Sequence, residues 1–320
     1  MKNNLLQITI LAVILLVSGM SGPANHVQVP FEPEFPEYPA FLEVDQAWAD
    51  SVMSKLSLED RIAQMMMVQA YSNMNKAHEK SVSKMISKYR VGGLAFFQGD
   101  PLSQARLTNK FQDQSKTPLL IAIDGENGLG MRLKNTITYP QQMALGAIGD
   151  DALLHQLGED IAWQMRRLGV HLNFAPVADV NNNPSNPVIN TRSFGENPVN
   201  VARKVLALSG GMQDGGLLVA AKHFPGHGDT DTDSHKSLPL VPYGRERLDS
   251  LELFPFREAI LRGLSGIMVA HLQVPGLDER ENRPATVSDR VVTDLLKGEL
   301  DFRGLVITDA LNMKGQSHFY

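Results

Sequence analysis

The 320-residue sequence predicts an α/β fold, a TIM-like (β/α)8 barrel that is truncated after its seventh strand. Short apolar runs alternate with amphipathic segments along the chain, and this alternation is typical of parallel strands covered by helices. Seven such units of similar length favour a closed barrel over an open doubly wound sheet. The seventh run lies close to the end of the sequence, so the eighth unit is missing and the outer strand edges would be exposed.

Composition narrows the class of protein. The chain is 43% hydrophobic and 20% charged, with a net charge of -5, as expected for a globular protein. The negative balance argues against nucleic acid or an anionic membrane surface as the main partner. The chain has no cysteine. Disulfides, thiolate metal ligands and a cysteine nucleophile are therefore excluded.

The N-terminus predicts export. Lys2 precedes an apolar run at 5–17 and small residues at 21–24, which is the order of a secretory signal peptide. We expect a signal peptide at 1–24, an extended Pro- and Glu-rich leader at 25–43 and the barrel domain at 44–320. The apolar run is short for a membrane span, so the mature protein should have no stable membrane insertion and should be periplasmic or extracellular.

The predicted elements follow hydrophobic periodicity. A helix with Trp48 and Val52 on one face precedes Ser57, which is expected to cap the next helix or turn. The clearest helix starts after Asp150 and Asp151 and stops at Gly169, and another begins at Ser288. The first of them places Leu154, Leu157, Ile161, Met165 and Leu168 on one face. The predicted strands are 65–68, 92–97, 119–123, 172–177, 217–221, 267–270 and 305–308.

Polar residues stand where these strands end. Because the carboxyl ends of parallel strands meet at one mouth of a barrel, side chains from distant segments should share one cavity. The residues that end or flank strands three to seven are Asp124, Asn173, Asp179, Lys222, His223, His271 and Asp309. Taken singly, each has a structural explanation as a turn, cap or core residue. Their succession along five strands favours an active site.

The segment 222–235 is the densest in chemistry. It gathers three histidines and three aspartates around two glycines, directly after an apolar run. A histidine with a carboxylate two residues away, as in Asp233 and His235, is a recurring catalytic pairing. A metal-dependent hydrolase is the alternative, with His223, His227, His235 and Asp229 as ligands. Against it, the first two histidines lie on a loop with Pro and Gly, not on one helix face.

Five groups of motif residues, the segment 222–235 among them, carry a family resemblance. They are Lys222 to Gly228 with Asp233-Ser234-His235, Ile307-Thr308-Asp309-Ala310-Leu311, Asn173 to Val180, Arg192-Ser193-Phe194-Gly195, and Ala270-His271 with Pro284-Ala285-Thr286. On these residues the chain, from about Leu56 onward, resembles the glycoside hydrolase family 3 β-N-acetylglucosaminidases of the bacterial cell-wall-recycling type. The resemblance implies hydrolysis of terminal N-acetylglucosamine from an oligosaccharide, without a metal or other cofactor.

The resemblance also assigns roles. It makes Asp309 the nucleophile and His235 the general acid/base, paired with Asp233. Asp124, Arg132, Arg192, Lys222 and His223 would hold the terminal sugar, and His271 is counted with them. A histidine, whose unperturbed pKa is about 6.5, suits proton transfer near neutral pH. A loop that closes over bound sugar would bring His235 into reach.

The loop after Asp124 departs from the family pattern at one point. The family often has a Gly-Gly-Arg run there, whereas this chain has Gly128-Leu129-Gly130, although Arg132 keeps its place. The loop 125–130 also lacks the glycine spacing of a dinucleotide-binding fingerprint. Because the barrel is short, an inactive sugar-binding fragment remains a second interpretation.

Overall fold

The structure is a computed structural model that describes residues 37–234 and 237–314. These residues belong to one of the chain's two compact units, Pro33–Tyr320. The predicted signal peptide, most of the predicted leader and His235 lie outside the described residues. Within the described ranges, no helix combines the length and apolar character that a membrane span requires.

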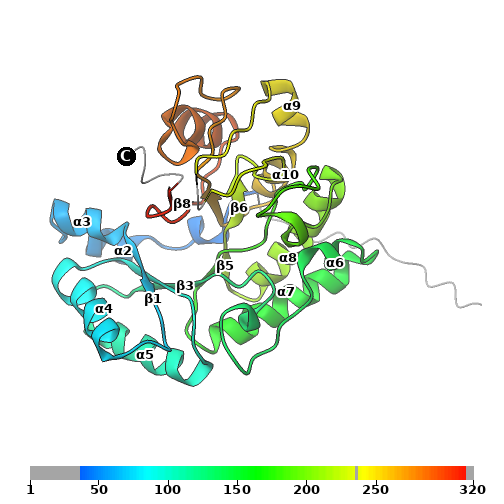
Figure 1. Ribbon diagram of the computed structural model, residues 1–320. Helices are drawn as coiled ribbons and strands as arrows, with labels where there is room; N and C mark the ends of the chain where they lie inside the picture. The colour runs from blue at the N-terminus through cyan, green and yellow to red at the C-terminus, as the bar shows by residue number, and fades with distance from the viewer. Residues whose placement is uncertain (1–36, 235–236, 315–320) are drawn as a thin grey trace, which may run out of the picture. The chain divides into compact units, whose positions relative to one another are not determined.

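Helices and strands alternate along the described chain (Figure 1). The elements up to the third strand are η1 (Ala40–Leu42), α2 (Ala47–Met53), α3 (Leu58–Gln64), β1 (Met67–Ala70), α4 (Lys76–Tyr89), β2 (Gly93–Phe96), α5 (Pro101–Gln114) and β3 (Leu120–Ile123). The next are η2 (Leu129–Met131), α6 (Gln142–Gly146), α7 (Asp151–Arg166), β4 (Leu172–Asn173), η3 (Asn190–Arg192), α8 (Pro198–Asp214), β5 (Leu218–Val219) and β6 (Ala221–Phe224). The last are α9 (Arg245–Ser250), α10 (Phe254–Ile260), β7 (Gly266–Val269), η4 (Ala285–Val287), the π-helical η5 (Arg290–Glu299) and β8 (Leu305–Thr308).

Polar side chains cap the starts of α3 and α7, and the cap of α3 is the predicted one. The Ser57 hydroxyl accepts a hydrogen bond of 3.1 Å from the backbone N–H of Asp60 at the start of α3. Asp150 caps α7 in the same way, by accepting from Ala152 at 3.0 Å. The first predicted strand, 65–68, was placed two residues too early, because Met65 still terminates α3.

All strand pairs are parallel. One sheet has the order β1-β2-β3-β4-β5 and the other has the order β6-β7-β8. The predicted fifth strand, 217–221, is therefore wrong as a single element. The chain pairs with β4 through Leu218 and Val219, then with β7 from Ala221 onward, with a register shift between Lys222 and Phe224. The change of partner falls at Ala220, before this register shift.

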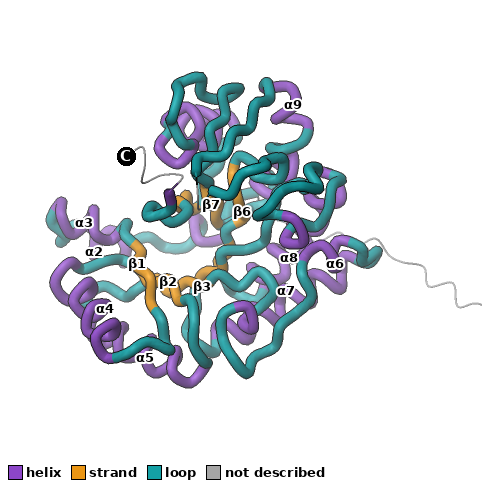
Figure 2. The backbone as a smooth tube through the Cα atoms, viewed as in Figure 1, coloured by secondary structure: helices purple, strands orange, loops and turns teal. Residues whose placement is uncertain are grey.

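The strands of both sheets contribute to one core. Ala95, Ala122, Leu172, Phe174, Ala220 and Met268 form a buried cluster, with Met67 of β1 and Ile307 of β8 packed against it. Figure 2 shows the strands on the inside, with α4, α5, α7 and α8 outside β1 to β5. A shared interior supports the predicted barrel. The described residues show no ladder between β1 and β8, so closure and truncation remain predictions.

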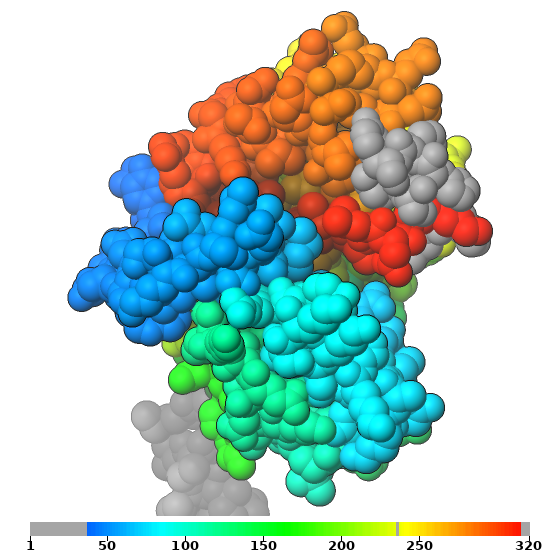
Figure 3. Space-filling model, turned by 90° about the vertical axis from the view of Figure 1, so that its left-hand side faces the viewer, coloured from blue at the N-terminus to red at the C-terminus, as the bar shows by residue number. Residues whose placement is uncertain are grey.

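Strand β8 is the least covered strand. Its first three residues are half-buried and Thr308 is exposed, whereas β2, β6 and β7 are buried throughout. Figure 3 shows the C-terminal described residues, in red, at the surface beside N-terminal segments, in blue. Asp309, which follows β8, is itself half-buried.

Candidate active site

The carboxyl ends of the strands bring the predicted residues together. Asp124 follows β3 directly, His271 lies two residues after β7, and Asp309 follows β8. The backbone N–H of Asp309 donates to the Val269 carbonyl at 2.9 Å, which extends the β7–β8 pairing to the catalytic candidate. Lys222 and His223 lie inside β6, not at the end of a strand as predicted, because pairing with β7 continues to Phe224.

Asp124, Arg132 and Lys222 form one ionic cluster. The ammonium of Lys222 lies 2.6 Å from Asp124 Oδ1 and is almost fully buried. Arg132 donates from Nε to the Asp124 carbonyl at 2.8 Å and pairs with Oδ2 through its guanidinium. A buried ammonium is tolerated only with such partners. Three of the predicted sugar-binding residues are thus fixed against one another.

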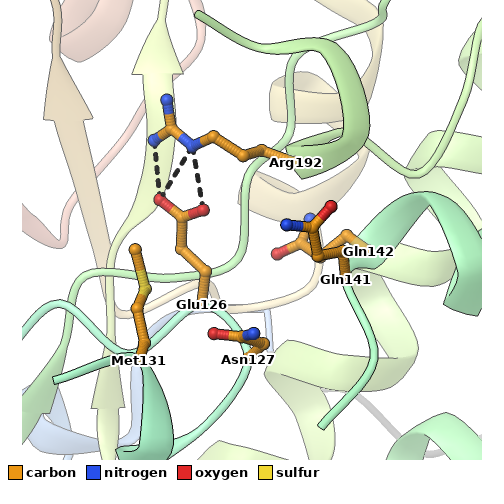
Figure 4. Close-up of a pocket in the computed structure, with 6 residues that line it drawn as sticks. All are labelled: Glu126, Asn127, Met131, Gln141, Gln142 and Arg192. Carbon is orange, nitrogen blue, oxygen red and sulfur yellow. Dashed lines mark hydrogen bonds and ion pairs between the residues drawn. The ribbon is translucent and has the colours of Figure 1, made fainter. Parts of the chain in front are cut away.

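Glu126 links this cluster to Arg192, and the sequence interpretation missed it. Its Oε1 lies 2.7 Å from Lys222 Nζ. Figure 4 shows its contacts with Arg192, in which Oε1 accepts from Nη2 at 2.6 Å and Oε2 accepts from Nε at 2.9 Å. Burial raises the pKa of Glu126, but Lys222 and Arg192 lower it more, so the pKa is far below the ordinary range. Glu126 lies two residues after Asp124, and this acidic pair was the available signal.

Asp179 orients His223. It is fully buried, lies 2.6 Å from His223 Nδ1, and accepts from the backbone N–H of His227 at 2.7 Å. On the other side of the ring, Arg192 Nη2 is 3.3 Å from His223 Nε2. An ionised carboxylate only accepts, so the Nδ1–H of His223 donates to Asp179. Burial raises the pKa of Asp179, but contacts with His223 and His227 lower it below its usual value.

His271 is engaged at both ring nitrogens. Nδ1 lies 2.9 Å from the Thr286 hydroxyl, and Nε2 donates to the Ala310 carbonyl at 3.0 Å. The ring is fully buried. It therefore steadies the residue next to Asp309, and its predicted role in sugar binding stays a prediction.

Asp309 has the environment of an ionised carboxylate. Its Oδ1 accepts from the backbone N–H of Ala310 at 2.7 Å. Burial raises the pKa of Asp309, but His223, the Ala310 hydrogen bond, His271 and Lys222 lower it, with a net downward shift. An ionised carboxylate among cations and donors can act as a nucleophile or stabilise positive charge.

The loop after β6 is built around a buried histidine. His227 lies 2.7 Å from the Thr230 hydroxyl through Nδ1 and 3.2 Å from the Ser234 hydroxyl through Nε2. Burial, followed by the charge of His223, lowers the pKa of His227 to about 4. Asn186 donates to the carbonyls of His227 and Gly228 at 2.8 and 3.0 Å. This loop carries Asp233 and leads to His235, which lies outside the described residues.

The metal alternative finds little support in this geometry. Both ring nitrogens of His227 face hydroxyl groups, and His223 is held between Asp179 and Arg192. In the described ranges, which leave out His235, no three His, Asp or Glu side chains are grouped as metal ligands.

A cavity of about 230 Å³ opens beside the Glu126–Arg192 pair. Figure 4 shows its lining residues, which are Glu126, Asn127, Met131, Gln141, Gln142 and Arg192. The side-chain amide of Gln142 already binds the backbone. It donates to the Val177 carbonyl at 3.0 Å and accepts from the Val177 N–H at 3.1 Å. The cavity adjoins the ionic cluster and offers amide, thioether and charged groups to a polar ligand.

Comparisons with known proteins identify the family of the chain. Residues 57–320 match the Glycosyl hydrolase family 3 N terminal domain. The chain is 40% identical over 262 residues to β-hexosaminidase A of Pseudoalteromonas piscicida, covering 75% of this chain and 44% of that protein. It is 33% identical over 291 residues to β-hexosaminidase LpqI of Mycobacterium tuberculosis, covering 87% and 72%.

A solved structure is similar as well. A glycoside hydrolase family 3 β-N-acetylglucosaminidase from Paenibacillus sp. str. FPU-7 superposes with a TM-score of 0.77 at 42% identity, covering 83% of this chain and 51% of that one. Fold and site thus define a glycoside hydrolase domain. The chain belongs to glycosyl hydrolase family 3. It spans about half the length of the Pseudoalteromonas and Paenibacillus proteins.

Proposed function

We propose that the chain is a retaining glycosidase that removes terminal non-reducing β-linked N-acetylglucosamine through a covalent glycosyl-enzyme intermediate. The observation that carries the proposal is the Asp309 carboxylate, whose pKa is lowered beside Lys222, His223 and His271. Relatives named β-hexosaminidase and β-N-acetylglucosaminidase support the same reaction.

Asp309 supplies the first bond of the proposed mechanism. One of its oxygens attacks the anomeric carbon while the bond from that carbon to the leaving oxygen breaks. The leaving oxygen takes a proton from His235, whose protonated ring Asp233 would stabilise as the aspartate of a triad does. Neutral His235 then takes a proton from water, which attacks the anomeric carbon and releases Asp309. The sugar leaves with its original β configuration.

The ionic cluster supplies the proposed sugar site. Asp124, Arg132, Lys222, Arg192 and His223 present charged donors and acceptors that are fixed before substrate arrives. Charged hydrogen bonds of this kind hold sugar hydroxyls in a fixed geometry. Glu126 forms an ion pair with each of two cations, the buried Lys222 and the half-buried Arg192. The site therefore positions the anomeric carbon with little rearrangement on binding.

The natural substrate and location belong to the proposal too. We infer an oligosaccharide derived from peptidoglycan, or a chitin-like one, because the motifs resemble cell-wall-recycling enzymes. The predicted signal peptide at 1–24 supports export to the periplasm or beyond.

Substrate selectivity tests the proposed function. The 320-residue chain is expected to hydrolyse 4-nitrophenyl N-acetyl-β-glucosaminide with a kcat/KM on the order of 100-fold or more above that for the matching glucoside. Nitrophenol release measures both, with and without a chelator. No turnover by a folded chain would favour the inactive sugar-binding fragment. Loss of turnover in chelator would restore the metal-dependent alternative.

A further inference from the structure

One arginine outside the catalytic motifs is attached to the loop after β6 in two ways. Arg247, on α9, donates from Nη2 to Asp229 Oδ2 in a long hydrogen bond of 3.4 Å. The same nitrogen lies 3.2 Å from Glu252 Oε1. Its guanidinium stacks over the Tyr243 ring at 4.5 Å. The Arg247 side chain thus joins α9 to the Asp229 carboxylate inside the loop and to the Glu252 carboxylate outside it.

Glu252 contacts the beginning of the loop. A Cβ on Gly226 would lie 2.6 Å from the Glu252 Cβ, so the buried glutamate packs directly against this glycine. The two Glu252 carboxylate oxygens have no hydrogen bond within the described residues, and Arg247 is their ion-pair partner. Burial raises the pKa of Glu252 and Arg247 lowers it, with a net value of about 7. Ionised Glu252 near neutral pH therefore depends on Arg247.

Asp229 is the attachment point within the loop. It accepts from Asn182 Nδ2 at 2.8 Å and from the Tyr243 hydroxyl, a contact that raises the Tyr243 pKa. Asp229 lies four residues before Asp233 in a segment that His227 closes through Thr230 and Ser234. A shift of Asp229 would move this closed segment as a unit.

We propose that Arg247 is a positioning residue that holds the loop 226–234, and with it Asp233, in the arrangement needed for proton transfer to the leaving group. The inference rests on the proposed function. Arg247 touches none of the groups placed at the sugar, so its loss should weaken acid catalysis and leave attack by Asp309 intact. General acid catalysis matters little for a good leaving group and much for a poor one.

The test compares two aryl N-acetyl-β-glucosaminides with Arg247→Met. We expect kcat/KM to fall about 30-fold for the phenyl glycoside and by less than about 3-fold for the 2,4-dinitrophenyl glycoside. Arg257→Met is the matched control, because Arg257 is similarly exposed and pairs with Asp249 at 2.9 Å, away from the loop. This control should leave the ratio of the two rates unchanged.

Equal losses on both substrates, or no loss on either, would overturn the proposal. Thermal unfolding checks that Arg247→Met is folded. If it is not, Arg247→Lys decides, because it keeps one positive charge but has no planar guanidinium to stack over the Tyr243 ring. It should show a smaller loss, again confined to the phenyl glycoside. Absence of wild-type turnover on both substrates would instead contradict the proposed function itself.

Discussion

Asp309→Asn is expected to lower kcat on 4-nitrophenyl N-acetyl-β-glucosaminide by about 10⁴-fold. The amide has the size of the carboxylate but neither its charge nor its ability to form a stable ester with the sugar. Because surrounding groups lower the pKa of Asp309, the wild-type nucleophile should stay ionised below the pH at which an ordinary aspartate is protonated. In a kcat/KM profile measured against pH, loss of rate from this group should therefore appear at a lower pH than for an ordinary aspartate.

The matched control for this change is Asp301→Asn. Asp301 is half-exposed, pairs with Arg303 on the surface and has a left-handed backbone that asparagine also accepts. Its activity should equal that of the wild type. A turnover number for Asp309→Asn within tenfold of the wild-type value would show that another group is the nucleophile.

Glu126→Gln should weaken both binding and stability. The neutral amide leaves Lys222 and Arg192 without their shared counterion, although Asp124 still faces Lys222. Removing one member of a buried ion pair costs about 3 kcal/mol of unfolding free energy. We expect that loss in denaturant unfolding, together with a kcat/KM on the order of 100-fold lower, mainly through KM, because the sugar-binding cations lose their fixed positions.

The stability that Glu126 contributes depends on pH, because the pKa of Glu126 is lowered in the folded chain. In the folded chain the pKa of Glu126 lies far below its unfolded value, which is about 4.3. The stabilisation by Glu126 is therefore present above that value and is lost as the pH falls through the folded pKa.

Glu159→Gln, at an exposed position on α7, is the control for Glu126→Gln and should change neither the unfolding free energy nor kcat/KM. If Glu126→Gln kept the wild-type stability and KM, the proposed role of Glu126 in the site would be wrong.

Local patterns predicted much of the fold. The capping role of Ser57 and the buried face of α7 follow from spacing within one or two turns, and the structure confirms them. The division of the fifth strand into β5 and β6 was not predictable, because it depends on a change of partner between β4 and β7. Sequence spacing carries no information about which distant strand supplies the next hydrogen bond.

The site was predicted unevenly for the same reason. Asp124, Arg132 and Lys222 were predicted as sugar-binding residues, and they meet in one ionic cluster. The partners of Glu126 lie 66 and 96 residues away along the sequence, and Asp179 contacts a histidine 44 residues away. Such long-range pairs fix the orientation of the predicted residues, yet neither motif nor periodicity reveals them.

Trapping the covalent intermediate tests the proposed mechanism most directly. The chain would be mixed with a slow substrate, 5-fluoro-N-acetyl-β-glucosaminyl fluoride, quenched in acid, digested and analysed by mass spectrometry. We predict one N-acetylhexosaminyl group on the peptide that contains Asp309, and none in Asp309→Asn. Turnover of the substrate by the wild-type chain without any labelled peptide, or with the label on another carboxylate, would contradict the proposed mechanism.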